Sequence, residues 1–281
     1  MTTANDAVIA TQPLSEHLGA AISEVDRERF TQDAAYPAAV LQALEEHSVL
    51  LFREVHVSDD ELQVFARGLA DASAGPEAQS PWIMPITQSP DDGMANYFRG
   101  NLLWHMDGAT GDIPDRANLL SAQTIGPDDA GTEFASTYAA YADLTPEEQE
   151  RFAELRVVHT IEATLRPVVP DPTPAEVASW RKRPPKEHPL VWRRRSGRRS
   201  LVLSSTADHV VGMDLDEGRA LLADLLERAT RPERVLRHDW TVGDLVIWDN
   251  TGLVHRVTHH DPTSKRKLHR ATIPGDEAIS G

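Results

Sequence analysis

Short strand-like segments separated by turn residues fill the last third of the 281-residue chain, and they constrain its fold more than any other feature. Each is rich in Val, Leu, Ile or Trp, and turn-forming residues such as Gly, Pro and Asp stand between them, which is typical of strands joined by turns. The segments are residues 190–192, 200–203, 235–240, 244–248 and 268–273. A helix expected over residues 214–230 interrupts the series. The pattern favours a β-sandwich or jelly roll over alternating βαβ units.

The earlier part of the chain adds helices that would pack outside such a core. Ser58 and Glu61 have the spacing of a capping box, and Thr145-Pro146 interrupts a longer helical stretch. The expected helices are residues 37–47, 58–71 and 134–155, and the expected strands are residues 48–53 and 117–122. We therefore predict a mainly β fold with flanking helices, of the α+β class.

The rest of the chain is less regular. Residues 1–12 are predicted to be a flexible tail, residues 13–281 a single domain, and residues 72–96 an irregular loop. Seven prolines between positions 165 and 189 exclude one regular element there. A long irregular stretch inside a compact domain is usually functional or disordered. Residues 165–190 are thus either a lid or insert over a site, or a plain surface excursion.

The charge balance disfavours nucleic acid and anionic membranes as partners. The chain has 44 acids and 28 bases, a net charge of −16, whereas binding to polyanions needs positive surface. One stretch runs against this balance, because nine Arg or Lys residues and a single acid, Glu187, lie between Arg181 and Arg199. It is either a solvated hairpin that turns at Ser196-Gly197 or a basic rim that attracts an anionic substrate. A small-molecule substrate is expected in both cases.

The absence of cysteine excludes disulfides, thiolate metal sites, iron–sulfur clusters and thiol nucleophiles. The N-terminus has no basic start followed by an apolar core, so no secretory signal is expected. No uninterrupted apolar run approaches the ~18 residues that span a bilayer. These features predict a soluble protein of the cytoplasm.

Three residues could hold a metal ion through nitrogen and oxygen atoms. His105 and Asp107 are two residues apart, so their side chains would share one face of a strand. His255 follows the apolar segment 244–248, and a strand end is a suitable place for a third ligand. Two imidazoles and one carboxylate suit a non-haem Fe(II) that keeps open coordination positions. Such a set also occurs by chance, and zinc accepts the same ligands, so the spacing alone leaves these alternatives open.

Two arginines near the end of the chain point to a partner with carboxylates. Arg266 and Arg270 enter an apolar strand, where their charges are costly to bury unless they pair with anions. Arginine binds carboxylates in a bidentate manner, and 2-oxoglutarate carries a carboxylate at each end. The alternative is a pair of solvated charges on an edge strand.

In their order and spacing, these motifs resemble the taurine dioxygenase-like family of Fe(II)/2-oxoglutarate-dependent oxygenases, which includes aryloxyalkanoate dioxygenases and alkyl sulfatases. The resemblance covers nearly the whole chain. It rests on residues 13–20, 49–53, Trp104-His105-Met106-Asp107, Gly131-Thr132-Glu133-Phe134-Ala135, Trp248-Asp249-Asn250, His255 and Arg266-Lys267-Leu268-His269-Arg270. It implies a double-stranded β-helix, the jelly-roll core also found in cupins, and a dioxygenase that uses Fe(II), 2-oxoglutarate and O₂.

The resemblance also implies roles for single residues. The iron ligands would be His105, Asp107 and His255. Thr132 and Arg266 would bind the distal carboxylate of 2-oxoglutarate. Arg270 would lie between the other end of this cosubstrate and the anionic group of the substrate.

Two further residues are candidates for substrate contact, Asn101 by its match to a substrate-facing position of the family and Trp82 as an apolar wall. Residues 80–85 contain no histidine where the taurine enzyme has one for the sulfonate, which disfavours taurine and favours a more apolar or aromatic substrate. Asp107 disfavours halogenation, since related halogenases replace this carboxylate with a small residue.

The implied reaction is hydroxylation of a small anionic organic substrate, with release of succinate and CO₂. Where the hydroxylated carbon bears a sulfate, sulfonate or aryloxy group, the product collapses and that bond is cleaved. Two alternatives use the same residues: a zinc-dependent hydrolase, and a non-catalytic jelly-roll protein that binds a small molecule. A dimer or tetramer of identical chains is also an expectation.

Overall fold

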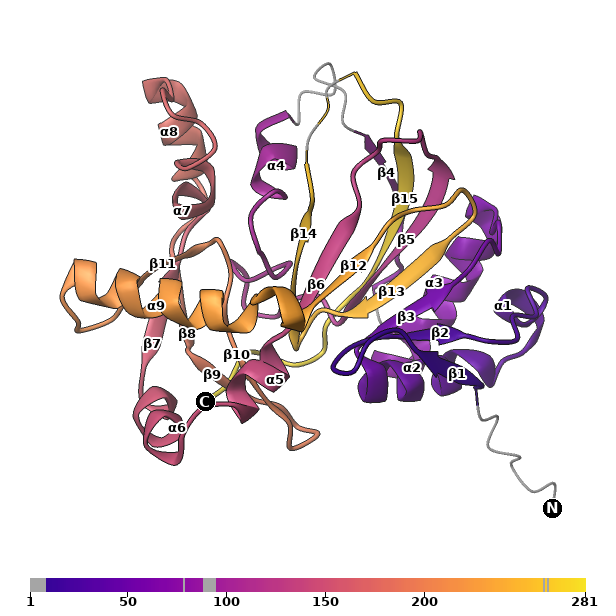
Figure 1. Ribbon diagram of the computed structural model, residues 1–281, viewed down its shortest axis with the longest axis horizontal. Coiled ribbons are helices and arrows are strands. Elements are labelled where there is room, and N and C mark those ends of the chain that lie inside the picture. The colour runs from indigo at the N-terminus through magenta and orange to yellow at the C-terminus, as the bar shows by residue number, and fades with distance from the viewer. Residues whose placement is uncertain (1–8, 78, 88–94, 260, 262) are drawn as a thin grey trace.

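The computed structural model of the chain describes residues 9–77, 79–87, 95–259, 261 and 263–281. A seven-stranded sheet in the order β1-β2-β3-β13-β5-β15-β4 forms its centre (Figure 1). Neighbouring strands are antiparallel, except that β2 and β3 are parallel. The strands are β1 (Thr11–Pro13), β2 (Ala20–Ile22), β3 (Val49–Phe52), β4 (Ile83–Thr87), β5 (Ala117–Thr124), β13 (Leu245–Asp249) and β15 (Lys267–Ile273). Because β13 lies between β3 and β5, the end of the chain completes a sheet that its first half begins.

Alternate side chains of the central strands enter two different cores. In β3, Leu50 and Phe52 face the helices, whereas Val49 and Leu51 face a second sheet. Successive side chains of a strand point to opposite faces, so a segment that is apolar throughout fits a strand buried on both sides. The covering helices are α1 (Arg29–Gln32), α2 (Tyr36–His47) and α3 (Asp59–Ala74). The predicted capping box is confirmed at the start of α3, where Ser58 and Glu61 bond each other's backbone N–H.

A three-stranded sheet packs on the other face of the large sheet. Its order is β12-β6-β14, with bounds Val235–His238, Thr132–Ser136 and Leu253–Val257. Phe134 and Leu253 of this sheet share a buried core with Leu51 and Trp248 of the large one. Two antiparallel sheets that face each other across a common core form a jelly roll. The predicted fold class, mainly β with flanking helices, is therefore confirmed.

Several of the remaining elements share a third core beside the two sheets. A second three-stranded sheet has the order β11-β7-β8, and β9 pairs with β10 as a hairpin. The strands are β7 (Arg156–His159), β8 (Lys186–Pro189), β9 (Val191–Arg193), β10 (Arg199–Leu201) and β11 (Ala207–Val210). The helices are α4 (Ala95–Gly100), α5 (Thr137–Ala142), α6 (Pro146–Ala153), α7 (Ile161–Leu165), α8 (Pro174–Trp180), α9 (Leu215–Ala229) and the 3₁₀ turn Pro232–Arg234. Figure 1 shows α9 lying across this part, with α7 and α8 above it and opposite α4.

Two sequence predictions were wrong in part. Residues 134–136 belong to β6 rather than to a helix, because they pair with β12 on one side and β14 on the other. Residues 72–96, predicted to be irregular, contain β4, which pairs with β15 at the sheet edge.

The prediction that prolines exclude one regular element from residues 165–189 is confirmed, because the stretch contains two separate short elements, α8 and β8. The first residue of α8 is Pro174 after the Thr173 cap, a position that tolerates proline because its N–H needs no partner.

The predicted tail lies mostly outside the described residues, which begin at residue 9, and Thr11–Pro13 form β1. Within the described ranges, no helix is both long and apolar enough to cross a membrane.

Candidate metal centre

His105 and His255 meet through their backbones although they lie 150 residues apart. The His105 N–H donates to the His255 carbonyl at 3.0 Å, and the His255 N–H donates to the His105 carbonyl at 2.9 Å. This isolated antiparallel bridge attaches residue 105 to β14 and places the two imidazole centroids 4.2 Å apart. Asp107 lies in the turn that follows, so the predicted strand is here reduced to a single bridge.

Two buried asparagines hold Asp107. The Asn250 side chain accepts from the Asp107 N–H at 3.0 Å and donates to the Asp107 carbonyl at 2.9 Å. The Asn118 amide donates to Asp107 Oδ2 at 3.1 Å. Asn250 directly follows β13 and Asn118 lies in β5, so the large sheet fixes both the turn and the carboxylate.

The donor atoms of the triad fit one metal ion. One ligand atom each from His105, Asp107 and His255 lies within 4.8 Å of the others. His105 Nδ1 lies 2.8 Å from the Leu103 carbonyl, which leaves Nε2 as the metal donor, and His255 Nε2 lies 3.4 Å from Asp107 Oδ2. The contact of His105 Nδ1 with a backbone carbonyl fixes the orientation and tautomer of this ring.

The protonation of the triad also suits a metal. Burial, with the neighbouring His105, holds the pKa of His255 well below its usual range, so this imidazole is neutral at pH 7. Burial alone would raise the pKa of Asp107, but the positive charge of Arg270, with smaller contributions from the two neighbouring imidazoles, outweighs it and lowers that pKa to about 2. A neutral imidazole beside a carboxylate is the state that binds divalent metal without first losing a proton.

A cleft next to the triad contains an arginine with unused donors. Thr132, Arg266 and His255 are among its lining residues. Arg266 is only 2% exposed, and its Nε and Nη2 have no hydrogen-bond partner among the described residues. Burial lowers the pKa of Arg266 to about 10, while the charge of Asp129 acts in the opposite direction. A buried guanidinium of this kind fits the carboxylate of a bound ligand.

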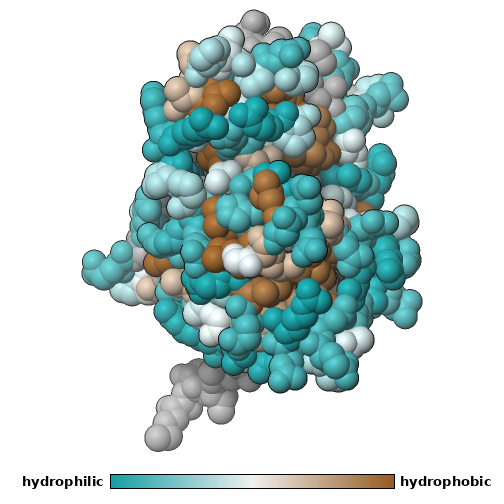
Figure 2. Space-filling view, turned by 90° about the vertical axis from the view of Figure 1, so that its left-hand side faces the viewer, coloured by the Kyte–Doolittle hydropathy of each residue, from teal (hydrophilic) through white to brown (hydrophobic). Residues whose placement is uncertain are grey.

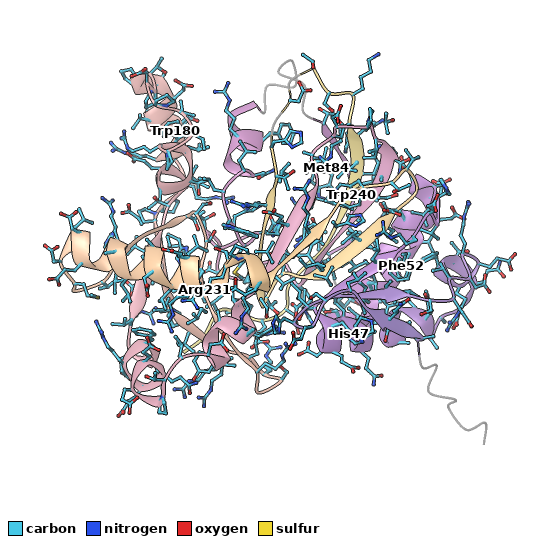
Figure 3. The ribbon with its side chains drawn as sticks, viewed as in Figure 1. His47, Phe52, Met84, Trp180, Arg231 and Trp240 are labelled. Carbon is cyan, nitrogen blue, oxygen red and sulfur yellow. The ribbon has the colours of Figure 1, made fainter. Side chains whose placement is uncertain are left out.

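The hydroxyl of Thr132 is oriented by a tryptophan that sequence reasoning did not select. Trp240 Nε1 donates to Thr132 Oγ1 at 3.0 Å. Trp240, labelled in Figure 3, packs in the core between the two sheets. Because Thr132 Oγ1 acts as the acceptor for Trp240, its hydroxyl proton can be donated to a carboxylate in the cleft.

A cavity of about 290 Å³ opens from the triad toward α7. Its lining residues include His105, Asp107, Asn101, Arg270, Asp115, Arg183, Ile161, Thr164 and Leu165. A larger cavity of about 420 Å³ on the other side of α7 contains none of the triad residues. Figure 2 faces that side and shows apolar side chains between polar ones. The smaller cavity is the one that can bring a molecule to a metal.

Arg270 is surrounded by acceptors. Its Nη2 lies 3.1 Å from Asp107 Oδ2 and 3.6 Å from Asp115 Oδ2, and Nε and Nη2 donate to Asn118 Oδ1 at 3.1 and 2.9 Å. Burial, followed by the charge of Asp107, raises the pKa of Asp115 to about 6 although Arg270 acts to lower it. The sequence analysis missed Asp115 and Asn118, because nothing local marks a polar residue that faces a site across the sheet. It included Asn250 in a matched motif but gave this residue no role.

The structure brings most of the predicted site residues together. His105, Asp107 and His255 converge, and Thr132 and Arg266 share the adjacent cleft. Arg270 and Asn101 line both this cleft and the cavity of about 290 Å³. The structure does not bring Trp82 to them, because this side chain is 61% exposed and lines neither the cleft nor that cavity.

The basic stretch is largely neutralised within the chain. The β9–β10 hairpin is confirmed, and the paired residues are Arg181 with Glu162, Lys186 with Asp112, Arg194 with Glu277, Arg195 with Asp276 and Arg198 with Glu45. Arg183 instead lines the cavity beside the triad. Most of this stretch is therefore a structural hairpin, and one residue of it reaches the candidate site.

Comparison with known proteins identifies relatives over nearly the whole chain. The family model described as "Taurine catabolism dioxygenase TauD, TfdA family" matches residues 10–272. The chain is 33% identical over 288 residues to the alpha-ketoglutarate-dependent 2,4-dichlorophenoxyacetate dioxygenase of Cupriavidus pinatubonensis, which covers 96% of this chain and 99% of that relative. It is 30% identical to the alpha-ketoglutarate-dependent sulfate ester dioxygenase of Pseudomonas putida, with 88% of this chain and 83% of that relative covered.

Solved structures are similar to this chain over nearly its whole length as well. The crystal structure of AAD-2 in complex with Mn(II) and N-oxalylglycine is similar with a TM-score of 0.82 at 30% identity, over 98% of this chain and 100% of that chain. A taurine dioxygenase from Burkholderia xenovorans is similar with a TM-score of 0.73 at 27% identity, over 97% of each chain.

Proposed function

Because the chain belongs to the TauD, TfdA dioxygenase family and is an Fe(II)- and 2-oxoglutarate-dependent dioxygenase, we propose that its substrate is a small organic anion with an apolar body. The relatives named for 2,4-dichlorophenoxyacetate and for sulfate esters act on molecules of this kind. The cavity of about 290 Å³, with Ile161 and Leu165 beside Arg183 and Arg270, supports a substrate that is part apolar and part charged.

We propose that His105, Asp107 and His255 bind the iron, and that Arg266 and Thr132 bind the distal carboxylate of 2-oxoglutarate. One observation carries this assignment. A guanidinium that is 2% exposed has two unpartnered nitrogens in a cleft that also reaches His105 and His255. A solvated edge-strand charge, the alternative for Arg266, does not agree with that burial. A zinc hydrolase would not need a buried arginine to bind the carboxylate of a cosubstrate.

With iron and 2-oxoglutarate bound, the centre supplies an oxidant made from O₂ that converts a substrate C–H to C–OH, while 2-oxoglutarate becomes succinate and CO₂. The protein supplies position and a dry environment. The Asn118 and Asn250 bonds hold Asp107 in place, and Trp240 keeps the Thr132 hydroxyl directed at the cosubstrate. Residues 165–190 would form one wall of the substrate cavity through Leu165 and Arg183.

The net charge of −16 supports a small molecule over nucleic acid as the partner. Taurine is disfavoured by the absence of histidine in residues 80–85.

The test is a succinate-release assay with Fe(II), ascorbate and 2-oxoglutarate over aryloxyalkanoates, alkyl carboxylates, sulfate esters and sulfonates. We expect substrate-dependent succinate from at least one anionic compound with an apolar body, and none from the Asp107→Ala variant. Turnover without 2-oxoglutarate would contradict the assignment, and so would full activity of Asp107→Ala. Circular dichroism of the variant checks that the loss is not one of folding.

A further inference from the structure

Asp115 is an acid of the substrate cavity that the proposed mechanism does not use. Among the described residues that line the cavity of about 290 Å³, the acids are Asp107 and Asp115. Asp107 is assigned to the metal ion, so Asp115 is the carboxylate that remains to face a substrate. Its side chain keeps 31% of its surface exposed. A molecule in this cavity therefore meets a negative group as well as Arg270.

The Asp115 carboxylate has no hydrogen-bond donor in the described part of the chain. Arg270 Nη2 lies 3.6 Å from Asp115 Oδ2, which is beyond hydrogen-bond distance. Arg270 instead donates through Nε and Nη2 to Asn118 Oδ1 at 3.1 and 2.9 Å, and Arg183 of the same cavity donates to the Thr110 hydroxyl at 2.8 Å. A partly buried carboxylate without donors is unfavourable, so this group is suited to a donor that a ligand brings.

The position of Asp115 is fixed with respect to the metal centre. Asn250 Nδ2 donates to the carbonyls of both Asp107 and Asp115, at 2.9 Å in each case. The next residue, Arg116, donates its N–H to the carbonyl of Ile273 in β15, also at 2.9 Å. The backbone at residue 115 is therefore attached both to the asparagine that holds the metal-binding turn and to the strand that carries the second site arginine.

An anionic group of a substrate near Arg270 also lies near Asp115, because the two side chains are 3.6 Å apart. An anion alone would be repelled by Asp115, since like charges at such short range disfavour binding. A substrate with an N–H or O–H donor beside its anionic group would give each of the two side chains its complement.

We propose that Asp115 binds a hydrogen-bond donor, an ammonium or a hydroxyl group, that lies next to the anionic group of the substrate. The inference rests on the proposed function and narrows its substrate class to anions that carry such a donor. Between the two donors an ammonium should bind more tightly, because a hydrogen bond between two charged groups is stronger than one with a neutral partner.

The test measures the binding of three probes that share one apolar body and one carboxylate. They are phenylpropanoate, its α-hydroxy derivative phenyllactate and its α-amino derivative phenylalanine. Calorimetry is done on the protein loaded with Mn(II) and 2-oxoglutarate without O₂, at pH 8, where the Asp115 carboxylate is ionised because burial raises its pKa only to about 6. We expect the wild type to bind phenylalanine roughly 10- to 100-fold more tightly than phenylpropanoate, with phenyllactate between them.

Asp115→Asn should raise the Kd for phenylalanine roughly 10- to 100-fold, whereas the Kd for phenylpropanoate should stay the same or fall because a like charge is removed. This contrast distinguishes donor binding from a role in positioning Arg270, since loss of a positioning residue would weaken all three probes alike. Asp115→Glu should restore part of the preference because it keeps a carboxylate. Asp112→Asn is the matched control: it removes a negative charge from the same loop at a residue that pairs with Lys186 and does not line the cavity, so it should keep the preference of the wild type.

The outcomes separate this inference from the function beneath it. If the wild type binds none of the three probes, the proposed substrate class is wrong and this inference falls with it. If the wild type binds phenylpropanoate as tightly as the other two, the substrate class stands and the donor assigned to Asp115 is wrong. A preference for the donor-bearing probes that Asp115→Asn retains, or an equal loss for all three in this variant, would also overturn the assignment.

Discussion

Replacing Arg266 with Met should make the ligand-free protein more stable while it weakens the binding of 2-oxoglutarate. Burial lowers the pKa of Arg266 from 12.5 to about 10, which means that the cation is less favourable in the folded chain than in water. At about 1.4 kcal/mol per unit, the shift corresponds to about 3 kcal/mol. Met must still pack in the same space, so we expect only part of this energy to appear as added stability. The free energy of unfolding should rise by about 1 to 2 kcal/mol, which corresponds to a rise in melting temperature of about 2 to 5 °C.

In the proposed complex with 2-oxoglutarate, the same substitution removes one partner of a buried charge pair. Such a truncation costs about 2 to 5 kcal/mol, and about 3 kcal/mol raises Kd roughly 150-fold. At a concentration of 100 times the wild-type Kd, 2-oxoglutarate stabilises the wild type by about 2.7 kcal/mol. The same concentration should stabilise the variant by only about 0.3 kcal/mol.

The assay is thermal unfolding with Mn(II) under anaerobic conditions, with and without 2-oxoglutarate. Arg237→Met is a suitable control, because Arg237 is an exposed residue of β12 that pairs with Asp239. It should change neither the melting temperature nor the response to 2-oxoglutarate beyond a degree or so. A variant Arg266→Met that is less stable without ligand and still responds fully to 2-oxoglutarate would refute the reasoning.

Three further predictions follow from the geometry. Asn118→Ala should weaken Mn(II) binding about 10- to 100-fold in calorimetry, because Asp107 loses a bond that orients its carboxylate. The pKa of Asp115 is raised to about 6, so its charge destabilises the fold above that pH and not below about 4. Asp115→Asn should therefore raise the free energy of unfolding of the metal-free protein by about 1 kcal/mol at pH 8, measured as a higher melting temperature, and lose this advantage at pH 4. Gly252→Ala should lower the free energy of unfolding in urea by about 1 to 3 kcal/mol, because the new Cβ would overlap the Tyr138 ring.

The sequence predicted those parts of the fold whose cause is local. The capping box at Ser58 and Glu61 and the apolar strands β3 and β13 are decided by neighbours along the chain, and all three were predicted. Residues 134–136 were misassigned because their strand depends on pairing with β12 and β14, which lie more than 90 residues away. Tertiary pairing overrode a helical pattern there.

Among the site residues too, those that belong to a local motif were predicted and those that act only through tertiary contacts were not. His105, Asp107, His255 and Arg266 were selected because their residue types and order match a known motif, and the structure places them around one cleft. Asp115 and Asn118 were missed, since each matters only through a contact across the sheet with Arg270 or Asp107. Trp82 was selected for its residue type alone, and its exposure shows why an aromatic residue in a loop is weak support for a pocket wall.

The reciprocal bonds between His105 and His255 also determine when in the life of the chain the metal can be bound. A ribosome that adds about 5 to 20 residues per second exposes His105 and Asp107 many seconds before it has made His255. Two ligands without the third hold a divalent ion only weakly, and the bridge forms only after a long loop has closed. If these three residues bind the iron as proposed, we expect the folded apoprotein to acquire it only after residue 255 has been made and paired with residue 105, and a chain truncated before residue 255 to carry no complete site.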